Sequence, residues 1–76
     1  MGNYEEIKRF GEKLHTLRQQ HGMTVIELGD MLGVGNSFVV RIEKGQRKPP
    51  TGFILGVSRI FDVPIDLLMK DELDLE

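Results

Sequence analysis

Apolar residues recur at helical spacing in five stretches of this chain. In the first stretch they follow one another in steps of three, four and three: Ile7, Phe10, Leu14 and Leu17. Such steps place side chains on one face of a helix. Gly11 lies inside this run and weakens the helix by about 1 kcal/mol relative to alanine, so we expect the helix to begin near Arg9. Residues 3–8 would then be an optional extension, with Asn3 and Glu6 as its capping box.

The stretch from Thr24 to Gly45 predicts two short helices joined by a tight turn. Thr24 and Glu27 have the spacing of a capping box, and Gly33 fits the left-handed position after the first of these helices. Gly29 sits where the two helices are expected to cross, so it either lets their backbones approach closely or is merely a weak point. A helix, a glycine-containing turn and a second helix form the arrangement that places a helix in the DNA major groove.

Two more helices follow the pair Pro49-Pro50, which stops any helix from running through the preceding loop. They span about residues 51–61 and 65–70. Five helices with short connections predict a compact all-α bundle. Its expected core is Phe10, Leu14, Leu17, Leu28, Leu32, Val34, Val39, Ile42, Ile54, Val57, Ile60, Phe61, Val63, Ile65 and Leu68.

The composition excludes several other classes of protein. The 76 residues contain no cysteine, so neither a disulfide nor a thiolate metal site supports the small core. His15 and His21 are six residues apart, unlike the i, i+4 pair of a helical metal site, and we expect both to be exposed. No catalytic constellation or phosphate-binding loop is recognisable, so we expect neither an enzyme nor a cofactor. The absence of a membrane-length apolar run and of a signal peptide predicts a cytoplasmic protein with no membrane partner.

Positive charge gathers on the second helix of the motif and on the loop after it. The whole chain has a net charge of −2, but residues 71–76 hold four of its twelve acids and none of its bases. We therefore predict a DNA-binding domain over residues 1–70 and an acidic tail over 71–76. That tail either frays, extends the fifth helix or packs on a partner. Within residues 36–48, Glu43 is the sole acid among four bases: Arg41, Lys44, Arg47 and Lys48. These bases could simply belong to a solvated loop. Their position on and directly after the helix-turn-helix favours contact with DNA.

Most of the chain, about residues 11–69, is covered by four stretches: LHTLRQQHGMT, IELGDMLGV, VVRIEKGQRKPP and ILGVSRIFDVPIDLLM. These stretches resemble the Cro/lambda-repressor-like helix-turn-helix domains of bacterial and phage regulators, also called the XRE family. The resemblance implies a compact five-helix fold with the helix-turn-helix at the second and third helices. It also implies an ion pair between Arg18 and Glu43 that links the first helix to the third, and breaking such a pair costs about 3–5 kcal/mol where it is buried.

The resemblance further implies which residues meet DNA. In the family, residues at and just inside the start of the third helix face the bases; here these are Asn36, Ser37 and Phe38, with Arg41 one turn on. Asparagine can pair with adenine and arginine with guanine, and each such pair discriminates by about 1–3 kcal/mol. Other roles stay open: helix capping for Asn36 and Ser37, and a phosphate contact or solvation for Arg41. Phe38 could instead cover a hydrophobic patch or serve a protein interface.

Phosphate contacts are expected from helix starts and from the basic loop. The expected residues are Thr24, Val25, Gly35, Lys44, Arg47 and Lys48.

The chain departs from the family pattern at three positions. Val25 stands where glutamine commonly contacts phosphate, Gly35 where Ser or Thr commonly precedes the third helix, and Val40 where a polar residue is common. Together with Phe38 and Val39, Val40 makes an apolar run of the kind that marks a protein-binding surface.

Two functions follow from these observations. The first is a sequence-specific transcriptional regulator that binds a pseudo-palindromic operator in double-stranded DNA as a homodimer, with half-sites roughly 34 Å apart. Its dimer surface is expected near the fifth helix, at Leu67, Met69 and Leu73. In the cytoplasm it would associate with the nucleoid when bound to DNA. The alternative is a protein-interaction or antitoxin-like module on the same fold, with weak or partner-dependent DNA binding.

Overall fold

The computed structural model describes residues 8–75. They form five α-helices and no strand: α1 (Phe10–Gln20), α2 (Val25–Leu32), α3 (Asn36–Glu43), α4 (Thr51–Phe61) and α5 (Ile65–Met69). The predicted five-helix, all-α architecture is confirmed, including the start of α1 directly after Arg9. The predicted capping box of Asn3 and Glu6, and most of the 3–8 extension, lie outside the described residues.

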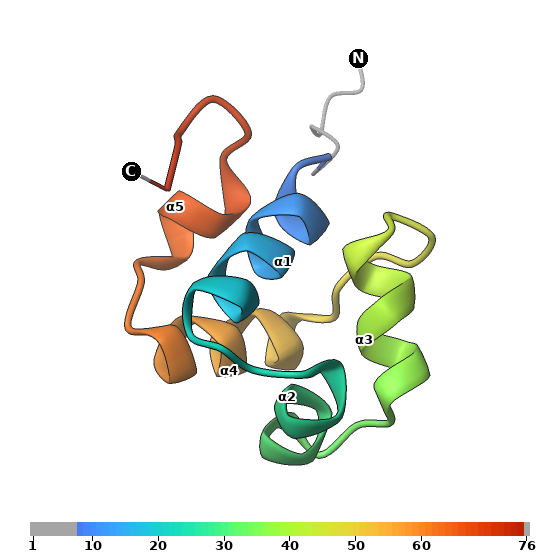
Figure 1. Ribbon diagram of the computed structural model, residues 1–76. Coiled ribbons are helices and arrows are strands. Elements are labelled where there is room, and N and C mark those ends of the chain that lie inside the picture. The colour runs from blue at the N-terminus through green and yellow to red at the C-terminus, as the bar shows by residue number, and fades with distance from the viewer. Residues whose placement is uncertain (1–7, 76) are drawn as a thin grey trace.

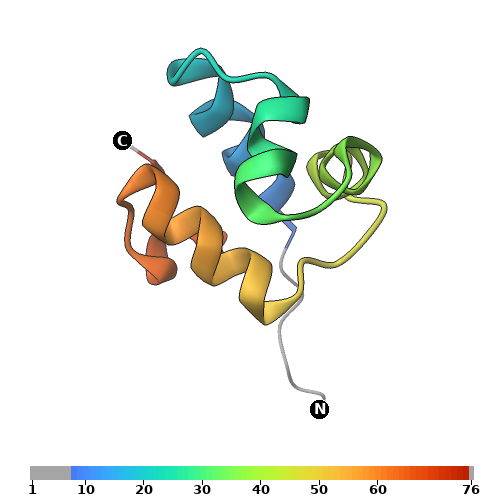
Figure 2. The ribbon, with the colours of Figure 1, turned by 90° about the horizontal axis from the view of Figure 1, so that it is seen from below.

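The first helix lies at the centre of the domain (Figure 1). It contacts α3 on one side and α5 on the other, whereas α2 packs against both α3 and α4. The view from below in Figure 2 shows α3 beside α2 and away from α5. The helix of the motif that was predicted to meet DNA therefore lies at one side of the bundle, and α5 lies at the other.

The core contains ten of the fifteen residues predicted from the sequence. Four others are half-buried and pack against the core: Leu32, Val34, Ile60 and Val63. Its buried apolar side chains are Phe10, Leu14, Leu17, Leu28, Val39, Ile42, Phe53, Ile54, Val57, Phe61 and Leu68. Phe53 was not expected there. It is buried because it lies one turn before Val57 and two turns before Phe61, on the same face of α4. Ile65 was expected in the core but is 38% exposed, because Leu68 supplies the buried contact of α5.

Two glycines lie where backbones come too close for a side chain. A Cβ on Gly11 would lie 2.7 Å from the carbonyl oxygen of Glu43 and closer still to that of Ile42. Gly11 is thus the contact point between α1 and the last turn of α3, and not merely a weak residue in a helix. A Cβ on Gly29 would lie 2.7 Å from the carbonyl oxygen of Val34. The predicted close approach at Gly29 is therefore present, but its partner is the turn before α3.

Gly52 offers the opposite case, because a Cβ there would meet nothing within 4 Å. It lies in the first turn of α4. We expect Gly52→Ala to raise the free energy of unfolding by about 0.5 kcal/mol, because alanine has the higher helix propensity and loses less backbone entropy on folding. The melting temperature in a circular dichroism scan should rise by about 2–4 °C. A lower melting temperature would contradict the open environment of this position.

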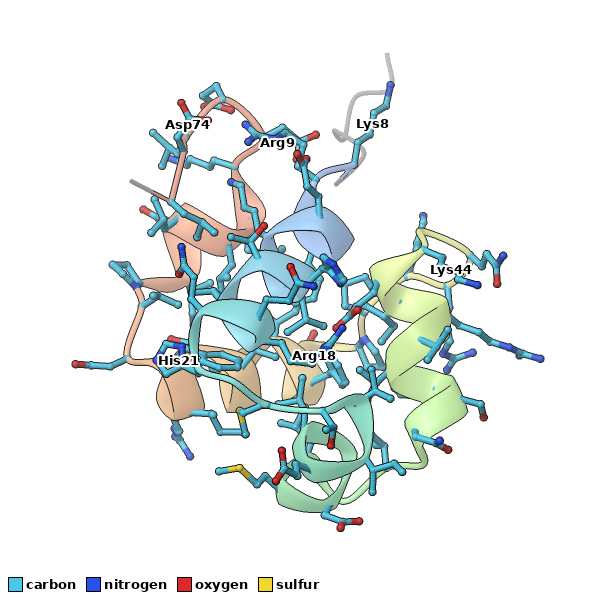
Figure 3. All side chains as sticks on the ribbon, viewed as in Figure 1. Lys8, Arg9, Arg18, His21, Lys44 and Asp74 are labelled. Carbon is cyan, nitrogen blue, oxygen red and sulfur yellow. The ribbon has the colours of Figure 1, made fainter. Side chains whose placement is uncertain are left out.

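The C-terminal segment 71–75 folds back on the start of α1. The Asp71 carboxylate accepts hydrogen bonds from the backbone N–H groups of Lys8 (2.9 Å) and Arg9 (3.0 Å). Arg9 donates in turn to the Asp71 carbonyl oxygen and to the Asp74 carboxylate, as Figure 3 shows for the labelled Arg9 and Asp74. Hydrogen bonds from the backbone of Arg9 and Lys8 hold the pKa of Asp71 below its usual range. A carboxylate from the far end of the chain therefore fixes the backbone directly before α1. Of the alternatives left open for the tail, the extension of α5 is wrong, because α5 ends at Met69.

A buried lysine joins the same two ends of the domain. Lys13 is 1% exposed, and its Nζ donates to the carbonyl oxygens of Leu67 (2.6 Å) and Lys70 (2.8 Å) at the end of α5. The burial of Lys13 was not predicted, although the sequence holds a signal for it. Lys13 lies three residues after Phe10 and four before Leu17, which places it on the apolar face of the helix. Two carbonyl acceptors satisfy its charge in the interior.

Candidate nucleic-acid interface

The start of α2 is held by the predicted capping box. The Thr24 Oγ1 accepts from the backbone N–H of Glu27 (3.0 Å), and the Glu27 carboxylate accepts from the backbone N–H of Thr24 (2.8 Å). Val25 is half-buried and packs against the core, so its side chain faces inward. Its peptide N–H lies in the first turn, where helical N–H groups have no intrahelical partner. Any anion contact at this position would therefore be made by the backbone.

The turn between α2 and α3 is set by hydrogen bonding and by a left-handed residue. Gly33 ends α2 at φ +75°, and the N–H of Val34 donates to the carbonyl oxygen of Gly29 (2.9 Å). Gly35 is the N-cap of α3 and is extended, with no side-chain cap. The capping role considered for Asn36 and Ser37 is therefore wrong, since both lie inside the helix.

The third helix separates an inner face from an outer one. Val39 and Ile42 are fully buried, whereas Asn36, Ser37 and Arg41 are exposed. Three of the four residues predicted to contact bases are thus accessible on one short helix.

Phe38, the fourth predicted base-contacting residue, packs within the protein. Its ring lies edge-on to that of Phe53, with 5.7 Å between the two ring centroids. The guanidinium carbon of Arg47 lies 4.7 Å from the centroid of the Phe38 ring. Of the alternatives considered for Phe38, the structure shows the covering of an apolar patch. The ring is half-buried between these two neighbours.

Arg18 and Glu43 connect α1 with the end of α3. The Arg18 Nε donates to Glu43 Oε2 (2.7 Å) and its Nη2 to Oε1 (3.1 Å). Its Nη1 donates to the carbonyl oxygen of Met23, directly before the cap of α2 (2.9 Å). In Figure 3 Arg18 points from α1 into the space beside α3. One guanidinium therefore ties both ends of the helix-turn-helix to the scaffold helix, as two-point pairing with a carboxylate allows.

The environment of this pair favours its charged form. Burial raises the pKa of Glu43, but hydrogen bonds from Arg18 and His15 outweigh burial and bring that pKa below its ordinary value. The hydrogen bond to Glu43 raises the pKa of Arg18.

The two histidines are exposed as predicted, but each makes contacts that the sequence did not indicate. The Nδ1 atom of His15 lies 2.9 Å from Glu43 Oε1 and 3.1 Å from Arg18 Nη2. The Nδ1 atom of His21 lies 2.9 Å from the carbonyl oxygen of Leu17, and its ring lies edge-on to that of Phe61. The contacts of His15 with Glu43 and of His21 with Phe61 join different helices, so residue spacing along the chain gives no signal for them.

The basic residues predicted to meet phosphates directly follow α3 in the chain and are exposed: Lys44, Arg47 and Lys48. Glu43, the single acid of residues 36–48, is only 8% exposed and is paired with Arg18. Figure 3 places Lys44 on the side of α3 away from α1. The other exposed bases of this segment are Arg41, Arg47 and Lys48. Because the acid is neutralised inside the domain, this basic surface (Arg41, Lys44, Arg47 and Lys48) is more positive than the sequence count suggests.

Within residues 8–75, no group of three or more His, Cys, Asp or Glu side chains is placed to hold a metal ion. No helix in the same range is long and apolar enough to cross a membrane.

Comparison with known proteins identifies the family. A family model described as helix-turn-helix matches residues 14–68. This chain belongs to that family. Its resemblance to lambda-repressor-like domains is confirmed by the N-terminal DNA-binding domain of SinR from Bacillus subtilis, with a TM-score of 0.77 at 26% identity over 86% of this chain and 96% of that one. The P22 c2 repressor, solved in complex with a synthetic operator, has a TM-score of 0.77 at 25% identity over 83% of this chain and 96% of the repressor chain.

Curated relatives are longer than this chain. A protein of Pyrococcus furiosus, named as a candidate HTH-type transcriptional regulatory protein, is 38% identical over 55 residues, which are 72% of this chain and 18% of that protein. The chain spans about half the length of relatives from Bacillus subtilis that are named as HTH-type transcriptional regulators. The similarity therefore concerns the helix-turn-helix domain that these regulators contain.

Proposed function

We propose that this chain is the sequence-specific, double-stranded-DNA-binding domain of a transcriptional regulator of bacterial or phage type, with α3 in the major groove. The observation that carries the proposal is that α3 buries Val39 and Ile42 and turns Asn36, Ser37 and Arg41 outward, beside the basic surface. A repressor with this fold has been solved on an operator. A regulator of this kind is not an enzyme and would act on the nucleoid in the cytoplasm.

Base readout would come from three side chains. The Asn36 amide can both donate to and accept from adenine, the Arg41 guanidinium can donate twice to guanine, and the Ser37 hydroxyl can serve either kind of base. Arg41 lies in the turn after the first two, which brings all three within reach of one groove.

Phosphate contacts would fix the register of the domain on the duplex. The N–H groups of Val25 and Gly35 lie at the starts of α2 and α3, where the helix dipoles favour an anion. The N–H of Thr24 is bonded to Glu27, so Thr24 would meet a phosphate through its hydroxyl group. Lys44, Arg47 and Lys48 would add charge contacts, so affinity should fall steeply with salt.

A homodimer would supply the second half-site. One domain offers few base contacts, and a two-fold dimer reading a pseudo-palindrome needs half-sites roughly 34 Å apart. The proposed dimer surface is the end of the chain around α5, where Leu73 is 37% exposed and Leu67 and Met69 are partly exposed. Because α5 lies away from α3, a contact there would leave the outer face of α3 open (Figure 1).

The apolar run on α3 no longer favours the alternative protein-interaction module. In the apolar run Phe38-Val39-Val40, Val39 is fully buried, Phe38 packs on Phe53, and Val40 is half-buried. No broad apolar patch remains on the outer face of α3 from this run.

Selection of bound duplexes from a random DNA pool tests the proposal. The wild-type domain should enrich a pseudo-palindrome at near-physiological salt. We expect Arg41→Ala to relax the sequence at one position of each half-site and to weaken binding to the selected duplex by about 5- to 150-fold per domain.

The matched control is Arg59→Ala, which removes the same charge from the exposed face of α4. This variant should retain the selected sequence. If the folded wild-type domain enriches no duplex even at low salt, the DNA-binding proposal fails and the protein-interaction module becomes the better account.

A further inference from the structure

A row of ring contacts runs from the centre of the core to the basic surface. The rings of Phe10 and Phe53 lie 6.2 Å apart, and those of Phe53 and Phe38 lie 5.7 Å apart, both in edge-on geometry. The guanidinium carbon of Arg47 lies 4.7 Å from the centroid of Phe38. Phe10 is 1% exposed and Phe53 5% exposed, so the inner end of the row is fixed by the core.

The outer end of the row sits in the loop between α3 and α4. Arg47 is exposed there, two residues before Pro49. A long arginine side chain on such a loop samples many rotamers, and ordering it on binding a phosphate costs affinity. Contact with the face of an aromatic ring limits those rotamers before the ligand arrives.

The contact leaves the chemistry of Arg47 available. A cation–π contact uses the charge of the guanidinium and none of its five N–H donors. Within the described residues, no hydrogen bond or ion pair of Arg47 engages those donors. Arg47 is therefore held in place while it can still donate to an anion.

We propose that Phe38 is a positioning residue that holds Arg47 ready to bind a DNA phosphate. This inference rests on the proposed DNA-binding function and assigns to the helix residue a role different from base contact. The apolar side chain on a helix that meets DNA thus acts through the loop arginine beside it. The buried rings of Phe10 and Phe53 hold the Phe38 ring in place, and the Phe38 ring in turn limits the positions of the Arg47 guanidinium.

A double-mutant cycle on DNA affinity tests the proposal. We would measure the dissociation constant of the full chain for a 30-base-pair duplex at several salt concentrations, for wild type, Phe38→Leu, Arg47→Gln and the double variant. Arg47→Gln should weaken binding and lower the salt slope by about 1. Phe38→Leu should weaken binding by about 2- to 5-fold, and by no further factor once Arg47 is already replaced.

Arg41 separates positioning from a general tilt of α3. A tilted helix would disturb Arg41 as well, so the losses from Phe38→Leu and Arg41→Ala should multiply if Phe38 acts only through Arg47. Phe38→Tyr keeps a ring face and should retain wild-type affinity. Urea unfolding of each variant would identify changes in stability, and the cycle would be measured where every variant is folded.

The outcomes distinguish this inference from the function on which it rests. If the losses from Phe38→Leu and Arg47→Gln multiply, or if Phe38→Leu binds like wild type, the positioning role is overturned while DNA binding stands. If the wild-type domain binds no duplex at low salt, both proposals fall.

Discussion

Glu43→Gln is expected to lower the free energy of unfolding at pH 7 by about 3 kcal/mol. The carboxylate is 8% exposed and its partner guanidinium 14% exposed, so the charge left on Arg18 would have little water to replace the lost anion. A domain of this size has about 5–10 kcal/mol of stability in total, so the loss is a large fraction. Urea unfolding followed by circular dichroism would measure it.

The same ion pair predicts how stability depends on pH. Because hydrogen bonds from Arg18 and His15 outweigh burial, the pKa of Glu43 in the folded protein lies below its ordinary value of 4.5. The unfolded chain therefore binds this proton more readily, and acid favours unfolding. The stability that the pair supplies should be complete above about pH 5 and be lost as the pH falls through 4.5 and then through the lower folded value. The difference between wild type and Glu43→Gln should shrink over that range.

Asp30→Asn provides the control, because it removes one carboxylate from an exposed position on α2. We expect a change of less than about 0.5 kcal/mol, as for most surface substitutions. Equal losses from both variants would mean that the Arg18–Glu43 pair contributes no more than net charge does.

Gly11→Ala should destabilise the domain by at least about 2 kcal/mol, although alanine is the better helix former by about 1 kcal/mol. The added methyl group would overlap the carbonyl oxygens of Ile42 and Glu43, which are backbone atoms and cannot rotate away. The clash can be relieved only by moving α1 away from the end of α3. We therefore expect weaker DNA binding as well as a lower melting temperature, since α3 would lose its position on the scaffold.

Gly52→Ala is the matched control for Gly11→Ala, because it makes the same chemical change in a helix with open space around the new methyl group. The two substitutions should have opposite signs in the same unfolding experiment. A Gly11→Ala variant as stable as wild type would show that α1 and α3 do not approach as closely as the structure indicates.

The helix-turn-helix itself was predictable because its signals are local. The capping box of Thr24 and Glu27 and the left-handed Gly33 involve residues a few positions apart, whose geometry depends on backbone sterics and nearby hydrogen bonds. The apolar spacing that marks Val39 and Ile42 as inner residues of α3 is local in the same sense. The exposed positions of Asn36 and Arg41 follow from it directly.

The partners of several side chains were not predictable from spacing. The Asp71 carboxylate binds the backbone N–H of Arg9, directly before α1, from 62 residues away in sequence. The Lys13 ammonium donates to carbonyl groups 54 and 57 residues away. From the sequence, Phe38 is an apolar residue on the helix expected to face DNA. In the structure its ring contacts Phe53 of α4 and the guanidinium of Arg47. Such contacts depend on which helix lies beside which.

The sequence by itself therefore determined the five helices, most of their buried positions and the outward residues of α3, because each depends on interactions within one or two helical turns. The tertiary structure alone decided that Gly11 is a contact between helices, that Phe38 packs inward, and that the chain's two ends are joined by Asp71 and Lys13. The physical reason is that packing brings together groups that are distant in sequence, and the energy of each contact depends on both partners and on their burial.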